Sequence, residues 1–166
     1  LPFPDASFDL VTSRIAPHHF PDVVRFVGEV QRVLAPGGTF ALIDNIAPDA
    51  ESTPGFSAGD LAQAALDYNA FEKLRDPSHV RCLGMAEWSN VVTGSGLRVT
   101  HKERLPKDME FDPWAVRLGC DAPTVARLRT MLTEGSSALQ AFLKPRPEKD
   151  ALWFTLDEAI LIARKP

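Results

Sequence analysis

The spacing of apolar and polar positions along the chain predicts strands and helices that alternate with one another. Residues 8–13 predict a short apolar strand, and residues 39–44 a buried strand that is apolar on both faces. Between them, apolar side chains at helical spacing predict a helix over about residues 21–34. Pro36-Gly37-Gly38 is its expected stop, since glycine adopts the left-handed conformation that helix ends use. This alternation of strand, helix and strand favours a parallel sheet and an α/β fold.

The rest of the chain continues in the same manner. Residues 48–59 are rich in Pro, Ser, Gly and acids, so they predict a loop, and a helix is expected over about 58–74. The later expected elements are a short helix over 87–93, a strand over 97–105 ended by Pro106, a polar hairpin-like loop over 144–150 and a last strand over 152–164. Asp112-Pro113 and Asp121-Ala122-Pro123 each predict a helix start, with Asp as the cap and Pro in the first turn.

Composition excludes several classes of protein. The net charge is −4 and no run of Lys or Arg occurs, which argues against a nucleic-acid partner. Cys82 and Cys120 have no metal-binding spacing. No apolar run approaches the roughly 18 residues of a membrane span, and residues 1–8 lack the features of a signal peptide. We therefore expect no membrane contact and a cytoplasmic location.

Two sequence blocks carry a family resemblance. The first is LPFPDASFDLV at residues 1–11, and the second is RVLAPGGTFALID at residues 32–44, with His18-His19-Phe20 between them. Together they resemble the class I S-adenosylmethionine-dependent methyltransferases, in particular the type 11 group, which is similar to the enzymes that C-methylate quinone precursors. The segment RDPSHVR at residues 75–81, followed by Glu87-Trp88, resembles a bacterial branch of small-molecule methyltransferases.

The resemblance implies a truncated Rossmann-like sheet. It begins at the family's fourth strand, so the chain is expected to hold strands four to seven of a sheet ordered 3-2-1-4-5-7-6, with the last strand antiparallel. The expected segments are a core over 1–47, a lid and substrate insert over 48–95, and a C-terminal sheet with helices over 96–166. The first strand would then be an edge, which is a template for pairing, so we expect a homodimer through it or a marginally stable chain.

S-adenosylmethionine is the cofactor that the resemblance implies. In the family, a glycine-rich turn after the first strand and an acidic residue after the second hold it, by the logic of dinucleotide folds. Here Gly37-Gly38 lies between a helix and a strand, and Gly94-Ser95-Gly96 follows a helix. We therefore expect half of the cofactor site to be missing and this chain alone to be inactive.

The candidate catalytic residues follow the first strand. His18 and His19 stand at the carboxyl edge, where open α/β sheets bind ligands, and histidine titrates near neutrality. Either one could be a general base or a pocket residue; alternatively one packs against Phe20 and the other faces solvent. Arg14, which closes the same strand, is the candidate cofactor contact. A metal site is not expected, because His18, His19 and Asp44 have no specific metal spacing.

The candidate substrate contacts are Asp44, Arg75, His79 and Arg81. Asp44 ends the second strand, where it could orient substrate or form a local turn with Asn45. The other three could hold an anionic or polar group, since arginine offers a planar fork of donors. The alternative, which we favour, is an internally paired loop that fixes the lid.

Two functional hypotheses remain open. The first is a methyltransferase acting on a small, ring-bearing molecule, catalytic when a glycine-rich half is supplied. The second is a non-catalytic remnant that binds a partner through its exposed strand. A hydride-transferring dinucleotide enzyme comes third, because it would need the same glycine loop.

Overall fold

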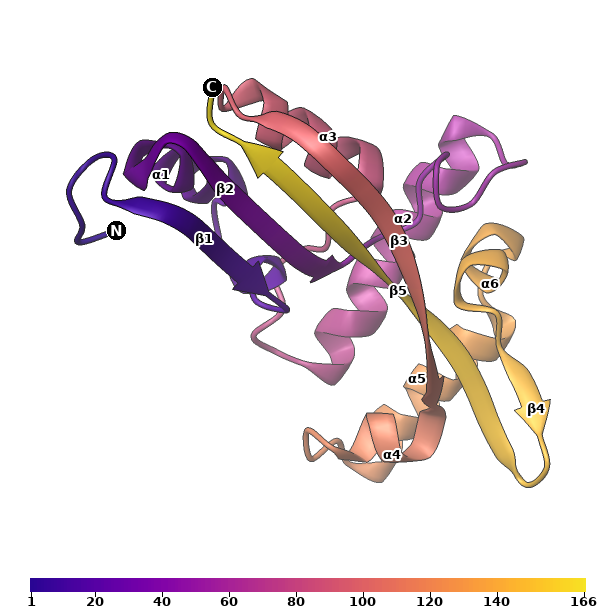
Figure 1. The fold of residues 1–166 in the computed structure, drawn as a ribbon. Helices are drawn as coiled ribbons and strands as arrows, with labels where there is room; N and C mark the ends of the chain where they lie inside the picture. The colour runs from indigo at the N-terminus through magenta and orange to yellow at the C-terminus, as the bar shows by residue number, and fades with distance from the viewer. The chain divides into compact units, whose positions relative to one another are not determined.

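The fold was analysed in a computed structural model that describes residues 1–166 (Figure 1). Two compact units make up the chain. Its elements are β1 (Phe8–Arg14), the 3₁₀ helix η1 (Pro17–His19), α1 (Val23–Val33), β2 (Leu34–Asn45), α2 (Ala58–Arg75), α3 (Met85–Gly94), β3 (Arg98–Glu110), α4 (Phe111–Val116), α5 (Ala122–Glu134), α6 (Ser137–Leu143), β4 (Arg146–Glu148) and β5 (Ala151–Arg164).

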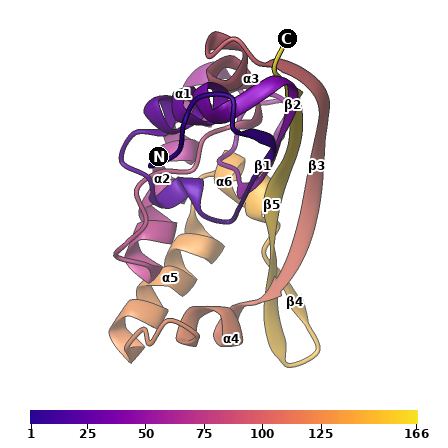
Figure 2. The same ribbon diagram turned by 60° about the vertical axis from the view of Figure 1, so that its left-hand side comes forward.

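Unit 1 contains residues 1–46, 81–105 and 158–166. Its strands lie in the order β1-β2-β5-β3, with β1 parallel to β2 and β5 antiparallel to β2. This is the 4-5-7-6 order, with an antiparallel last strand, that the family resemblance implies. Helices α1 and α3 lie on one face of these strands (Figure 2), where they cover buried side chains from β2 and β5.

The edge position of β1 agrees with the expectation for the first strand. It stands at one end of the strand order, and the side chain of Leu10 is 56% exposed. Pairing of a second copy along this edge stays a prediction.

The helix between β1 and β2 ends earlier than expected. Asp22 caps the start of α1, since its carboxylate accepts a hydrogen bond from the backbone N–H of Arg25 at 2.8 Å. The helix stops at Val33, and β2 begins at Leu34, so the expected stop at residues 36–38 is wrong. Those residues instead form an irregularity in the β1–β2 register, where Gly37 takes the left-handed φ of 78°.

Unit 2 contains residues 47–80 and 106–157. Its helices α2, α5 and α6 pack against one another, and α4 packs on α5. Asp121 caps α5 as the sequence predicted, accepting from the N–H of Thr124 at 2.9 Å. The core of the unit is aromatic, with contacting rings from Tyr68, Phe71, Phe111, Trp114, Phe142 and Phe154.

Two local expectations were wrong. Strand β3 passes through Pro106 and ends at Glu110, which an edge strand permits because its outer N–H groups need no partner. Helix α4 begins at Phe111 after Glu110, so Asp112 lies in its first turn and does not cap it. The expected hairpin-like loop over 144–150 contains the short strand β4, which pairs antiparallel with β5 and so forms a hairpin with it.

The expected lid segment over 48–95 contributes to both units, residues 48–80 to unit 2 and 81–95 to unit 1. A functional division of the chain at residues 47 and 95 stays a prediction. None of the helices has the length and apolar content needed to cross a membrane.

Candidate active site

A buried histidine–aspartate pair lies at the carboxyl ends of β1 and β2. The Nδ1 atom of His18 is 2.6 Å from Oδ1 of Asp44. The residue His18 is 7% exposed and Asp44 is fully buried. Both belong to unit 1, so the two side chains that the sequence analysis named separately form one group.

The architecture of unit 1 explains why they meet. The parallel strands β1 and β2 both end at the same edge of the sheet, and Asp44 is on the face of β2 that also carries the buried Phe40 and Leu42. After β1 the chain turns into η1, with Pro17 in its first turn, and this turn carries His18 to the neighbouring strand.

Burial dominates the electrostatics of Asp44. Removing the carboxylate from water raises the pKa of Asp44, and the hydrogen bond from His18 opposes that rise. The second carboxylate oxygen, Oδ2, has no hydrogen-bond partner in the chain. An unsatisfied buried oxygen is costly, so Asp44 combines a penalty to stability with a well-defined contact to His18.

The pairing determines which ring nitrogen of His18 can accept a proton. An ionised carboxylate only accepts hydrogen bonds, so Nδ1 of His18 carries the proton that lies toward Asp44. The neutral ring then has its lone pair on Nε2. Such an arrangement gives a neutral base whose protonated form is stabilised by the carboxylate behind it.

Backbone hydrogen bonds hold the turn that carries His18. The N–H of Arg81 donates to the carbonyl of His18 at 3.0 Å, and the N–H of His19 donates to the carbonyl of Ala16 at 3.0 Å. This role of Arg81 was not predicted, because a main-chain donor leaves no signal in the residue type.

The other two candidates near β1 differ in where they lie. The ring of His19 lies beside that of His18, with the ring centroids 4.1 Å apart. Arg14 is exposed and pairs in register with Ile43, which places it on the opposite face of the strands from Asp44. A cofactor contact by Arg14 stays a prediction.

The structure engages Arg75 within unit 2. Its Nε donates to the carbonyl of Trp114 at 3.0 Å, and its guanidinium lies 4.2 Å from the centre of the Trp114 ring. The ring of Phe71 also stacks on that of Trp114, with the ring centroids 5.0 Å apart and the planes at 12°. Burial lowers the pKa of Arg75. These contacts favour the structural alternative for Arg75.

The remaining two residues of the RDPSHVR segment also have partners. His79 is 1% exposed, and its Nε2 is 2.9 Å from Oδ1 of Asn69. Arg81 makes a two-pronged ion pair with Glu87, at 2.7 and 2.8 Å. Arg81 therefore meets the His18 turn through its backbone N–H, while its guanidinium pairs with Glu87. Substrate binding by Arg75, His79 and Arg81 stays a prediction.

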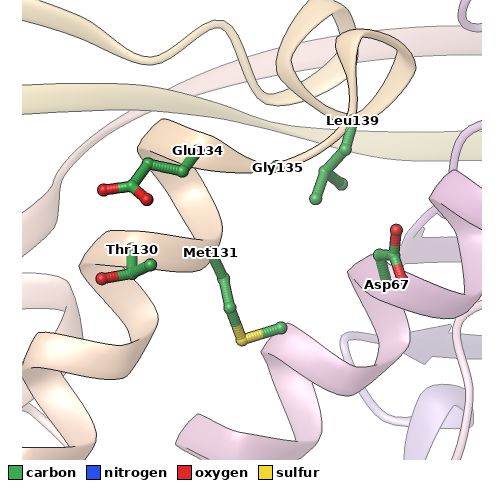
Figure 3. Close-up of a pocket in the computed structure, with 6 residues that line it drawn as sticks. All are labelled: Asp67, Thr130, Met131, Glu134, Gly135 and Leu139. Carbon is green, nitrogen blue, oxygen red and sulfur yellow. The ribbon is translucent and has the colours of Figure 1, made fainter.

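A separate hollow lies among the helices of unit 2. It has a volume of about 310 Å³ and contains none of the predicted site residues. Asp67 of α2 lies across it from Met131 and Thr130 of α5, as Figure 3 shows. Asp67 already accepts a hydrogen bond from Gln63 at 2.9 Å, and the lining of the hollow contains no histidine and no cysteine. The candidate active site is thus the His18–Asp44 pair.

No group of three His, Cys, Asp or Glu side chains is placed to hold a metal ion. Gly94-Ser95-Gly96 ends α3 and precedes β3, which is the reverse of the strand-to-helix order that a cofactor loop requires.

Comparisons with known proteins agree with the fold and with the two sequence blocks. A family model described as a methyltransferase domain matches residues 1–42. The Bacillus subtilis methyltransferase YcgJ is 36% identical over 136 residues, which are 82% of this chain and 49% of YcgJ. The chain thus spans about half the length of that relative.

A solved structure and a relative of stated activity extend the comparison. The crystal structure of a Bacillus halodurans protein described as a methyltransferase superimposes with a TM-score of 0.85, at 30% identity, over 100% of this chain and 73% of that one. The 27-O-demethylrifamycin SV methyltransferase of Amycolatopsis mediterranei is 39% identical over 75 residues, 40% of this chain and 28% of its own length.

Proposed function

The chain belongs to the class I S-adenosylmethionine-dependent methyltransferases, and we propose that its His18–Asp44 pair removes the proton from the methyl acceptor. The observation that carries this proposal is the 2.6 Å contact between two buried side chains at the carboxyl ends of parallel strands. Open α/β sheets bind their ligands at that edge.

The residues present fit a sulfonium methyl donor. With His18 neutral and Asp44 ionised, the pair has one negative charge, which is opposite in sign to a sulfonium ion. The unsatisfied Oδ2 of Asp44 adds a buried acceptor at the same place. When bound, S-adenosylmethionine supplies an electrophilic methyl group, and a protein needs only to align the acceptor and exclude water.

His18 then acts as a general base. Its Nε2 would take the proton of an acceptor O–H or acidic C–H, and the ring would become an imidazolium ion. The acceptor oxygen or carbon would gain the methyl group as the S–CH₃ bond of the sulfonium breaks, and the neutral thioether S-adenosylhomocysteine would leave. Asp44 stabilises the positive charge of the imidazolium ion and keeps the ring in one orientation through Nδ1. A positioned base of this kind contributes about 10²–10⁴-fold to a rate.

We propose a small, ring-bearing acceptor with an ionisable hydroxyl or carbon acid. Methylation of an oxygen or a carbon requires a proton to leave, which matches the base that the pair provides. The name of the rifamycin relative specifies an oxygen, which supports a hydroxyl acceptor. The narrower likeness to enzymes that methylate quinone precursors stays a prediction.

Two measurements on the full-length protein test the proposal. Calorimetric titration with S-adenosylhomocysteine should show binding at micromolar strength, and incubation with labelled S-adenosylmethionine and a panel of phenols, hydroxylated rings and carbon acids should label at least one of them. Binding without any transfer to O–H or C–H acceptors, combined with transfer to amines, would contradict the assigned chemistry. A folded protein that binds no cofactor product would support the alternative of a non-catalytic binding module.

A further inference from the structure

The residue that turns the chain out of β1 has an unusual backbone conformation. Ile15 has a φ of 48°, in the left-handed region that residues with a branched Cβ rarely adopt. Three other non-glycine residues have a positive φ: Ala6, Lys144 and Lys149. Ile15 is the one β-branched residue among the four and lies three positions before His18. Strain of this kind persists only where the surroundings enforce it, and it clusters at functional sites.

Hydrogen bonds hold the chain on both sides of Ile15. Its own N–H donates to the carbonyl of Ile43 at 2.8 Å, which continues the β1–β2 pairing one residue beyond the end of β1 at Arg14. Beyond it, the N–H of Phe20 donates to the carbonyl of Pro17 at 2.9 Å, and the N–H of Arg81 donates to the carbonyl of His18 at 3.0 Å. The bend is therefore fixed to β2 at one end and to the Arg81 segment at the other.

The direction of the bend decides where His18 lies. Arg14, the last residue of β1, is in register with Ile43 and is on the opposite face of the strands from Asp44. Strand alternation would place residue 15 on the face of Asp44, so the chain must turn after Arg14 for His18, three residues further on, to contact Asp44. Only Ala16 and Pro17 intervene between the bend and His18, and the ring of Pro17 fixes its own φ.

We propose that Ile15 is a positioning residue for the His18–Asp44 pair. Its left-handed backbone aims η1 so that Nδ1 of His18 meets Oδ1 of Asp44, and its branched side chain removes the conformational freedom that glycine would allow there. The role is indirect, since Ile15 acts through the place of His18 and contacts no reacting atom. This inference rests on the proposed function for its effect on catalysis, and on geometry alone for its effect on His18.

The test compares Ile15→Gly with a matched control, Lys144→Gly, in the full-length protein. Lys144 has a φ of 49° at the end of α6 in unit 2, so glycine relieves a similar backbone strain there without touching the turn of His18. In Ile15→Gly the relief of backbone strain offsets part of the apolar contact and chain entropy that glycine gives up, so both variants should remain folded, as thermal unfolding measures. Nuclear magnetic resonance of ¹⁵N-labelled histidine should then show the hydrogen-bonded Nδ1 proton of His18 in the wild type and in Lys144→Gly, and its loss or broadening in Ile15→Gly.

Methyl transfer provides the second measurement. Ile15→Gly should lower kcat by roughly 10–100-fold, the scale expected when a reacting group is misplaced by about 1 Å, while Lys144→Gly stays within twofold of the wild type. Ile15→Asn should recover part of the loss, because asparagine adopts the left-handed region readily and still has a Cβ.

Three outcomes can be told apart. If Ile15→Gly keeps both the His18 signal and the wild-type kcat, the inference is overturned while the proposed function stands. If Ile15→Gly loses the His18 signal and the wild type itself transfers no methyl group, the positioning role is supported and the proposed function is overturned. An unfolded Ile15→Gly with a folded, fully active Ile15→Asn would also overturn the inference, since the branched side chain would then serve stability alone.

Discussion

Nδ1 of His18 lies 2.6 Å from Oδ1 of Asp44, and the two residues are 26 positions apart in the chain. The pair exists because two parallel strands end at the same edge and the turn after the first strand bends toward the second. Both side chains are buried, so their contact is formed away from bulk water, where hydrogen bonds to charged groups are strong.

Replacing Asp44 by Asn should lower kcat by about 10²–10⁴-fold. The amide has a similar shape, but it provides no negative charge for the imidazolium ion and can hold the wrong tautomer of His18. Turnover with the best acceptor measures the effect. Asp22→Asn, which changes an exposed helix cap, is the control and should leave kcat within twofold. Equal losses in both variants would contradict a specific role for Asp44.

The stability of the protein should depend on the ionisation of Asp44. Burial raises its pKa, so its protonated form is favoured by folding. The stability that this proton contributes is fully present below the usual carboxyl pKa of 3.8 and is lost as pH rises through the raised pKa of the folded state. The free energy of unfolding should therefore fall over that window relative to a variant that cannot ionise at residue 44.

Urea unfolding between pH 3 and pH 8 measures this difference. The comparison is best made between H18N and the double variant H18N/D44N, because H18N removes the titration of His18 and retains a donor toward Asp44. A difference that stays constant with pH, or that grows as pH rises, would show that burial does not raise the pKa of Asp44.

Truncating Arg75 should cost far more stability than truncating Arg81. Arg75→Ala removes a hydrogen bond to Trp114 and a stacked cation, and a loss of about 2–4 kcal/mol is expected. Arg81→Ala removes an ion pair whose side chains are 56% and 41% exposed, which is worth less than about 1 kcal/mol. Denaturant midpoints measure both, and the reverse order would contradict the structural role of Arg75.

Two glycines should respond to alanine in opposite directions. An alanine Cβ at Gly28, on the exposed side of α1, meets no atom within 4 Å, so Gly28→Ala should stabilise by about 0.5–1 kcal/mol. At Gly135 the Cβ would lie 2.7 Å from the carbonyl oxygen of Met131, so Gly135→Ala should destabilise by about 1–3 kcal/mol. Thermal unfolding measures the change in stability of each variant. Two changes of the same sign would contradict the packing described at these two glycines.

Periodicity in the sequence was sufficient to predict the main strands and helices of unit 1. The stripe that contains Val27 and Val30 predicted the buried face of α1, and the apolar runs predicted β2 and β5. Strand order came from the family resemblance, because no local pattern says which strands are neighbours. Short elements were missed where local signals compete: Pro106 suggested a strand end, yet an edge strand accepts it.

The candidate site was predicted residue by residue and not as a group. His18 and Asp44 were both named, since each follows a strand, but their contact depends on the backbone of Ile15, which has no sequence signature. Arg75 and Arg81 looked like ligands for an anion, and the sequence could not show that Trp114 and Glu87 already bind them. Which side chains become partners across such distances in the sequence depends on how the helices and strands pack.

The central claim is that His18 takes the acceptor's proton, and the rate of methyl transfer by H18N tests it most directly. Asparagine keeps a donor toward Asp44 and removes Nε2, so the fold and the affinity for S-adenosylhomocysteine should be retained. The account predicts a kcat lower than that of the wild type by about 10²–10⁴-fold, with His19→Asn within tenfold of the wild type. Transfer by H18N at the wild-type rate would contradict it.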